Sequence, residues 1–275
     1  MLSGPILLIG YDVESSGNPE VVREFLTRAE AIHRRFDAPC TLFLVGKVVE
    51  NNSGDLEELI DRSDLFDIQQ HTYSHTLLKT VCMDDGEGIK LVPSGSLEDI
   101  REEVRRTNEL IRESFALECR GITGPWGYYR GLSDRPDILG ILHENGMRFL
   151  RTWARNERDY QPVPFEIQPF WYGPQGFPDM LECPIHGWQD VHWRDVNGWA
   201  STDEYLEMLK ETVDMVMEND LVWGYGTHDW SSMKEDPDMS VMVGLMEYAL
   251  DSGLEIMDYL TFYSHCEDER EANTQ

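Results

Sequence analysis

The chain is organised around the stretch Leu65-Phe66-Asp67-Ile68-Gln69-Gln70-His71-Thr72-Tyr73-Ser74-His75, in which two histidines four residues apart follow a short apolar run. The apolar run predicts a buried strand that passes into a helical turn. Residues four apart in such a turn project from one face, so both imidazoles can bind one divalent cation. A histidine pair at this spacing is by itself more often a helix surface or a buried pair, so further ligands must come from elsewhere in the chain.

A second apolar run, Pro5 to Tyr11, leads directly into Asp12-Val13-Glu14. It predicts a strand that is buried on both faces and carries carboxylates at its C-terminal end. Because they are two residues apart, Asp12 and Glu14 point to the same side of this strand. One of them can bind a metal while the other acts as a base, although carboxylates at strand ends also cap turns or pair with arginines.

Strands and helices alternate along the whole chain. Apolar periodicity predicts helices at 20–36, 55–62, 97–115, 136–145, 202–218 and 241–251, and strands at 5–11, 39–45, 65–68, 147–151, 177–184, 221–225 and 254–257. Such alternation is typical of a parallel sheet covered by helices. No GxGxxG or Walker loop follows the first strand, which favours a closed or nearly closed barrel over an open sheet. We expect one domain over residues 1–266.

Three segments are expected to lie outside these elements. Residues 76–96 form a long irregular excursion, of the kind that serves as a lid, as a substrate rim or simply as a mobile loop. Residues 120–131 are rich in glycine and aromatic side chains and predict a loop. Residues 267–275 predict a disordered acidic and polar tail.

The charge balance is strongly negative. The chain has 52 acidic residues against 23 basic residues, a formal net charge of −29. Such a surface repels phosphate backbones and anionic lipids, which disfavours binding to nucleic acid or to a membrane surface. The scarcity of lysine among the basic residues suits a halophilic source, where salt screens the repulsion, and an ordinary acidic protein explains it equally well.

The sequence also carries indications of compartment. The N-terminal segment Met1-Leu2-Ser3-Gly4-Pro5 has neither a basic region nor a long apolar stretch, and no apolar run approaches the roughly 18 residues of a membrane span. The five cysteines are odd in number and show no CxxC spacing, which indicates reduced thiols. We therefore expect a cytoplasmic protein without stable membrane insertion, and the sequence leaves homo-oligomerisation open.

The polar residues at strand ends suggest a hydrolytic metal site. A catalytic zinc site uses three protein ligands and keeps a fourth position for water. His71 and His75 supply two ligands, and a carboxylate on a neighbouring strand can supply the third. A nearby carboxylate can accept the proton of the bound water as it attacks a carbonyl. His228, at another strand exit, can protonate the leaving nitrogen, or it can be a packed histidine beside Trp230.

The order of these segments resembles the polysaccharide deacetylases of the chitooligosaccharide-deacetylase homology type, carbohydrate esterase family four. The resemblance extends from about residue 5 to residue 262. It implies a distorted (β/α) barrel of seven strands. It also implies one divalent metal ion, zinc before others, with Asp12 as the base, His228 as the acid and Arg120 orienting Asp12. The implied metal ligands are Glu14, His71 and His75.

The resemblance further implies a substrate groove. The residues that match its walls are Pro125, Trp126, Tyr128, Trp188, Asp190 and Trp193. The aromatic members of this set can equally be core residues, and Arg120 can be a surface ion-pair partner. His186 and His192 are spare candidates for a catalytic role. Three departures from the family pattern are Asp-Val-Glu instead of adjacent acids, extra residues between Arg120 and Pro125, and Gly226-Thr227 instead of an apolar residue before His228.

The activity that the resemblance implies is removal of an N-acyl group, acetyl before others, from an amino sugar in a small-molecule, oligosaccharide, glycan or glycolipid precursor. Relatives with this architecture open cyclic amides of the allantoin or imide kind, and the altered residues before His228 permit this second activity. A metal-free carbohydrate-binding relative is a third alternative, because Glu14 stands where the family carries aspartate.

Overall fold

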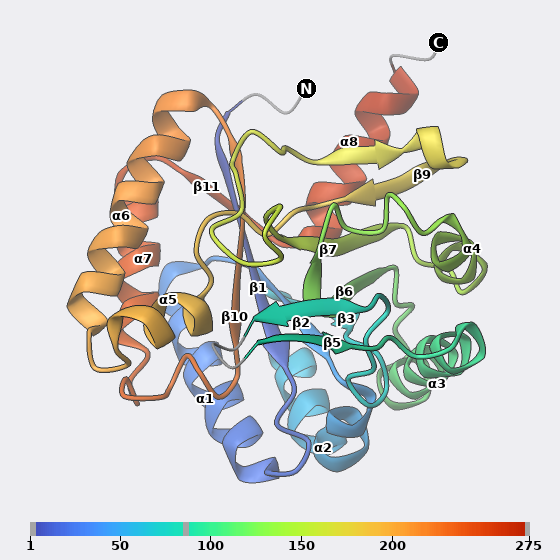
Figure 1. Ribbon diagram of the computed structural model, residues 1–275. Coiled ribbons are helices and arrows are strands. Elements are labelled where there is room, and N and C mark those ends of the chain that lie inside the picture. The colour runs from blue at the N-terminus through green and yellow to red at the C-terminus, as the bar shows by residue number, and fades with distance from the viewer. Residues whose placement is uncertain (1–3, 85–87, 273–275) are drawn as a thin grey trace.

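The computed structural model describes residues 4–84 and 88–272, and its central feature is one large sheet (Figure 1). The strand order is β10-β1-β2-β3-β6-β7-β9-β8, and β11 also pairs with β1. All neighbours on this path run parallel except β8 and β9. The strands are β1 Ile6–Val13, β2 Cys40–Leu44, β3 Phe66–Gln70, β6 Gly121–Tyr129, β7 Phe149–Arg155, β8 Phe170–Tyr172, β9 Phe177–Glu182, β10 Val222–His228 and β11 Glu255–Met257.

Helices surround this sheet. Figure 1 shows α6 and α7 on one side, α3 and α4 on the other, and α1 and α2 below. The helices are α1 Pro19–Phe36, α2 Gly46–Arg62, α3 Leu97–Phe115, α4 Pro136–Glu144, α5 Asp190–Asn197, α6 Thr202–Asn219, α7 Ser240–Asp251 and α8 Tyr259–Ala272. Within the described ranges, no helix has the length and apolar character that a membrane crossing requires. The predicted class, a distorted (β/α) barrel, is confirmed.

Strand β1 lies at the centre of the fold, and every one of its residues is buried. Alternate side chains enter two different cores, because successive residues of a strand point to opposite faces. Leu7 and Ile9 pack in the large core with the helices. Ile6 and Leu8 pack in a second core with Tyr259 of α8. Burial on both faces explains why the first apolar run is continuous.

Several elements differ from the sequence-based predictions. Residues 76–96 are not wholly irregular, because β4 (Val81–Asp84) and β5 (Ile89–Val92) form an antiparallel hairpin. The predicted loop at 120–131 is mostly strand β6, whose pairing with β7 shifts register between Thr123 and Tyr128. Helix α2 begins at Gly46 rather than at residue 55. In each case, tertiary pairing and packing override the local signal of glycine and polar residues.

The predicted C-terminal tail is also shorter than expected. Helix α8 continues to Ala272, so residues 267–272 are helical rather than disordered. Tyr263 of α8 donates a hydrogen bond to Glu267 (2.6 Å) and Arg270 lies over the ring of Trp171. These contacts explain why an acidic segment is ordered. Residues 273–275 lie outside the described residues.

The barrel is not closed by a strand ladder at its last seam. Between β7 and β10, the segment that follows β9 makes a few isolated hydrogen bonds to both sides, including that from Cys183 N to Leu150 O (2.7 Å). Ile185 N donates to Trp153 O (2.9 Å), and His186 N donates to Gly224 O (2.9 Å). Gly224 permits this approach, because a Cβ atom there would lie 2.2 Å from Pro184 O. The close approach of backbone to backbone therefore depends on the missing side chain.

We expect Gly224→Ala to lower the free energy of unfolding by about 1–3 kcal/mol, because the new methyl group can be accommodated only by moving backbone. Gly54→Ala in α2 is the matched control, since a Cβ atom there meets no other atom within 4 Å. That substitution should stabilise the protein by about 0.5–1 kcal/mol through helix propensity. Urea unfolding measures both values. Equal stabilities of the two variants would contradict the proposed role of Gly224.

Candidate active site

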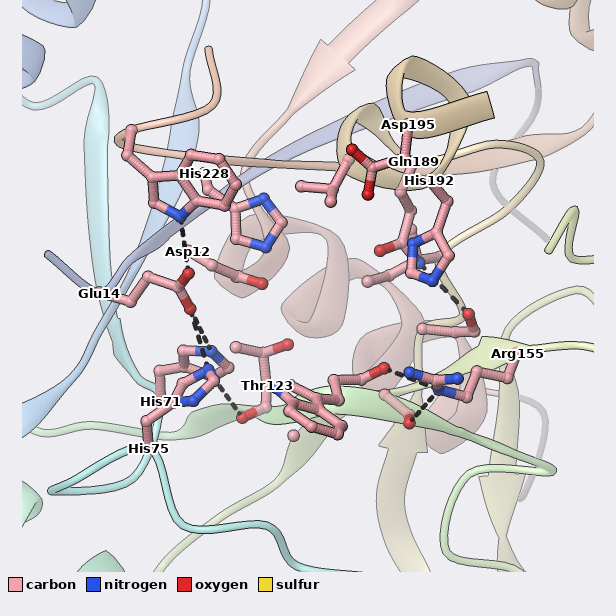
Figure 2. Close-up of a pocket in the computed structure, with 17 residues that line it drawn as sticks. Asp12, Glu14, His71, His75, Thr123, Arg155, Gln189, His192, Asp195 and His228 are labelled. Atoms are coloured by element: carbon pink, nitrogen blue, oxygen red, sulfur yellow. Dashed lines mark hydrogen bonds and ion pairs between the residues drawn. The ribbon is translucent and has the colours of Figure 1, made fainter. Parts of the chain in front are cut away.

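Glu14, His71 and His75 form a cluster that can hold a metal ion. One potential ligand atom from each residue lies within 4.8 Å of the other two. The Glu14 Oε2 atom is 2.9 Å from His75 Nε2 and 3.8 Å from His71 Nε2 (Figure 2). Glu14 follows β1 directly, and both histidines follow β3, which is the next strand but one in the sheet. The carboxyl ends of these parallel strands bring the three side chains together.

The two histidines approach each other through a loop, and the predicted helical turn is wrong. Thr72 and His75 have φ values of +59° and +63°, a left-handed backbone that no helix uses. The loop is held by β2 and α2, since His71 N donates to Leu44 O (2.8 Å) and Gly46 N donates to Thr72 O (2.9 Å). The four-residue spacing of His71 and His75 therefore correctly predicted that the two side chains meet, although the predicted helical geometry was wrong.

The hydrogen bonds around the histidines suit a cation. His71 Nδ1 donates to Thr123 O (3.0 Å), which leaves its Nε2 atom unprotonated and facing Glu14. Burial lowers the pKa of His71 to about 4, and contacts with Glu14 only partly oppose this effect, so the ring is neutral as a ligand must be. The buried His75 Nε2 atom lies 2.9 Å from Glu14 Oε2 and has no other polar partner among the described residues. The residues present therefore fit a divalent metal ion.

Glu14 is held by the two residues that follow His228. Trp230 Nε1 donates to Glu14 Oε1 (2.8 Å), which leaves Oε2 on the side of the histidines. The Asp229 carboxylate accepts the backbone N–H groups of Glu14 (3.3 Å) and Ser15 (3.1 Å). Burial disfavours ionisation of Glu14, but hydrogen bonds with His71 and His75 outweigh it and hold the pKa of the carboxyl well below its usual range. Glu14 is thus ionised and oriented as a potential metal ligand.

Asp12 lies beside this cluster and is paired with an arginine that the sequence did not indicate. Its carboxylate lines the same pocket and forms an ion pair with Nη2 of Arg151, a fully buried residue of β7. Arg151 Nε also donates to Thr123 Oγ1 (3.1 Å). The strand predicted at 147–151 ends at Arg151, whereas β7 continues to Arg155, so Arg151 lies inside the strand and no strand-end signal marks it.

The expectation that Arg120 orients Asp12 is wrong. Arg120 precedes β6, at the end of the strand away from the pocket, and its side chain is 40% exposed. Its guanidinium lies 4.0 Å from Glu267 and over the ring of Tyr263. The alternative interpretation, a surface ion-pair partner, describes it better.

Two glycines make room for Arg151. A Cβ atom at Gly10 would lie 2.7 Å from Arg151 Nη1, and a Cβ atom at Gly226 would lie 2.9 Å from it. Gly226 is one of the residues that depart from the family pattern before His228, and this contact gives it a packing explanation. Thr227, the other, is buried and donates to Asp190 (2.7 Å).

His228 is paired with Asp190. The expectation that Asp190 forms a groove wall is therefore wrong. His228 Nδ1 lies 3.1 Å from Asp190 Oδ2, and Ser231 Oγ also donates to that carboxylate. Burial alone would lower the pKa of His228, but the charge and hydrogen bond of Asp190 outweigh it and raise the pKa to about 9. Burial likewise opposes ionisation of Asp190, yet His228 holds its pKa at about 2. The imidazole is therefore protonated at neutral pH.

Of the predicted groove residues, Trp126 lines the pocket and is 41% exposed. Tyr128 is buried, and its hydroxyl accepts the backbone N–H of Leu78 (2.8 Å). Trp193 is buried against Tyr205, with ring centroids 5.0 Å apart. Pro125 and Trp188 are absent from the lining of this pocket. The expected groove-wall role therefore fails for these four residues at this pocket, because Tyr128, Trp193 and Pro125 are buried and Trp188 packs against the main core.

The pocket has a volume of about 270 Å³. His192, a spare candidate, lines it, whereas His186 is buried between Ile167 O and Gly224 N. None of the described residues of 76–96 lines the pocket. The lining residues to which the sequence assigned no role are Thr123, Gly124, Ala154, Arg155, Ile185, Gln189, Val191 and Asp195.

Comparison with known proteins places the chain in a family. The polysaccharide deacetylase family model matches residues 7–149, which is more than half of the chain. The chain therefore belongs to the polysaccharide deacetylase family, as its sequence predicts. A search of curated proteins gave no match.

Solved structures share the fold at low sequence identity. A Mycobacterium smegmatis protein classified with the polysaccharide deacetylases has a TM-score of 0.68 and 13% identity, over 98% of this chain and 93% of that one. Puue allantoinase has a TM-score of 0.67 and 16% identity, over 94% and 89%. A family four carbohydrate esterase pseudoenzyme from Bacillus anthracis has a TM-score of 0.55 and 16% identity, over 94% and 66%. At these identities the likeness concerns the fold alone.

We expect Trp230→Phe to weaken binding of a divalent metal by about tenfold or more, because Glu14 loses the donor that fixes its Oε1 atom. Trp199→Phe is the matched control. Trp199 packs against Trp230 with ring centroids 5.8 Å apart, but its indole N–H donates to Asp195. Competition with a chromogenic zinc chelator measures the affinity. Equal affinities of the two variants would contradict the proposed hold on Glu14.

Proposed function

We propose that the protein is a metal-dependent hydrolase that removes an N-acyl group, acetyl before others, from an amino sugar. The observation that carries the proposal is the meeting of three kinds of group in one pocket. These are a Glu-His-His cluster, a carboxylate held by a buried arginine, and a protonated histidine. Membership of the polysaccharide deacetylase family supports the reaction class.

Each residue has a role that follows from its contacts. A zinc ion held by Glu14, His71 and His75 would polarise the amide carbonyl and activate a water molecule. Asp12, oriented by Arg151, accepts the proton of the attacking water. His228, kept protonated by Asp190, donates a proton to the leaving nitrogen. Trp126, which is exposed at the pocket, offers a ring for packing against the sugar.

A second candidate function is the opening of a cyclic amide. The observation that favours it is the pocket volume of about 270 Å³, which lies below the usual range for drug-sized ligands and suits a single small ring. The similarity of fold to Puue allantoinase is compatible with this chemistry. Both reactions need the same groups, because each is attack of water on an amide carbonyl followed by protonation of nitrogen.

The test compares the wild type with His71→Ala and with the control His143→Ala. His143 pairs with Asp179 outside the pocket. After zinc is offered, we expect about one zinc ion per chain in the wild type and the control, and none in His71→Ala. Acetate release from N-acetylated chitooligosaccharides should follow the metal. Ring opening of hydantoin without acetate release would favour the second candidate. A wild type that binds no metal would overturn both and favour a carbohydrate-binding protein.

The proposed role of His228 as the acid predicts how the reaction rate depends on pH. His228 works in its protonated form, so the rate should fall as the pH rises through its pKa of about 9. Asp190→Asn removes the charge that raises this pKa, and the basic limb should move to lower pH by about one unit or more. Asp195→Asn, which removes a carboxylate from the same pocket lining, should leave that limb in place. Profiles of kcat against pH measure the shift, and an unmoved limb in Asp190→Asn would exclude His228 as the acid.

A further inference from the structure

The pocket has a second charged wall opposite the metal ligands. Arg155, the last residue of β7, lines the pocket and is 5% exposed. Figure 2 shows its guanidinium across the cavity from Glu14, His71 and His75. Among the described residues that line the pocket, Arg155 is the only arginine or lysine. No role in the chemistry above uses it.

The hydrogen bonds of Arg155 go to backbone oxygens, and its one ion-pair partner, Asp159, is 4.0 Å away. Its Nε atom donates to the backbone oxygens of Trp126 and Gly127 (3.1 Å each), and Nη1 donates to Asp159 O (2.5 Å). In the described part of the chain, Nη2 makes no hydrogen bond. The paired carboxylate, that of Asp159, lies 4.0 Å away and accepts the backbone N–H of Cys82. A buried cation with so little compensation is costly unless an anion joins it.

Neighbouring side chains leave polar atoms free on the same wall. The buried Nδ1 atom of His192 has no hydrogen-bond partner among the described residues. Gln189 donates through Nε2 to Ala154 O (3.3 Å) and also lines the pocket. The Asp195 carboxylate, which is repulsive to an anion, is engaged by the indole N–H of Trp199 (2.8 Å). The wall therefore offers a fixed guanidinium and an unpaired imidazole nitrogen.

We propose that Arg155 binds a carboxylate of the substrate, on the side of the scissile amide that faces away from the metal ligands. The inference rests on the proposed function and narrows its substrate to small N-acyl sugars or cyclic amides that carry an acid group. A guanidinium matches a carboxylate in geometry as well as in charge. In a chain with a net charge of −29, this buried cation provides a local site that attracts an anion.

A purely structural role of Arg155 makes a different prediction from a role in substrate recognition. Arg155 joins the shifted part of β6 to the segment after β7, so its loss can loosen the pocket as a whole. A loosened pocket weakens binding of acidic and neutral ligands alike. A recognition residue changes the ratio of the two affinities. The ratio is therefore the measurement that separates the two roles.

The experiment uses two ligand pairs that differ in a carboxylate. N-acetylglucosaminuronic acid is compared with N-acetylglucosamine, and hydantoin-5-acetic acid with hydantoin. Calorimetry measures the four affinities for the full-length, zinc-supplemented wild type, Arg155→Gln and Arg155→Lys. Arg158→Gln is the matched control, because it removes the same charge from an exposed residue of the same segment.

We expect the wild type and Arg158→Gln to prefer the acid of at least one pair by about tenfold or more. Arg155→Gln should abolish this preference, and Arg155→Lys should keep part of it, because it retains the charge and loses the planar fork. A wild type without preference for either acid would overturn the proposal. So would equal weakening of acid and neutral ligands in Arg155→Gln. If that variant does not fold, an unchanged ratio in Arg155→Lys would overturn it instead.

Failure of this inference and failure of the proposed function are distinguishable, because the binding measurement needs no turnover. Acid-selective binding that depends on Arg155, without acetate release or ring opening, would retain the carboxylate site and remove the enzyme. Hydrolysis that is equally fast for the acid and the neutral member of each pair would retain the enzyme and remove the carboxylate site.

Discussion

The buried ion pair between Arg151 and Asp12 is the interaction on which the arrangement of the site depends. Arg151 reaches from β7 to β1 across the barrel and is fully buried. Breaking such a pair leaves an uncompensated charge in the interior, at about 3–5 kcal/mol. Its place is kept by the absence of side chains at Gly10 and Gly226. A substitution at this contact on any of three strands, β1, β7 or β10, would therefore disturb the Asp12 carboxylate.

The positions of Asp12, Glu14, His71, His75 and His228 could be read from the sequence because each follows an apolar run, and parallel strands end together at one edge. The arginine could not be assigned by the same logic. Arg120 precedes its strand, whereas Arg151 lies inside one. The glycine and aromatic residues at 120–131 predicted a loop, so the length of β6 was not predicted. The packing of side chains at 125–128 and 188–193 depends on loop conformations that no periodicity encodes.

The site combines residues from an amino-terminal part of the chain with residues from a later part. The family model ends at residue 149, so it includes the three potential metal ligands and the Asp12 carboxylate but not Arg151, Arg155, Asp190 or His228. The later residues supply the partner of Asp12, the histidine with the raised pKa, and the wall opposite the metal ligands. The match to the family model therefore includes the Glu-His-His cluster and Asp12, whereas the later part of the chain supplies their buried partners and the second wall of the pocket.

Strand β10 is attached differently to its two neighbours in the barrel. On one side β10 pairs with β1 along the whole length from Ile6 to Asp12, and the Asp229 carboxylate adds a clasp onto Glu14 and Ser15. On the other side, it is attached to the chain after β9 by isolated contacts, between His186 and Gly224 and from Thr227 and His228 to the Asp190 carboxylate. Because Asp190 bonds to His228 across this seam, a shift of the segment after β9 would move the partner of His228, while Asp229 and Trp230 keep their contacts with Glu14. The wall that carries Gln189 and His192 is therefore linked more directly to His228 than to the Glu-His-His cluster.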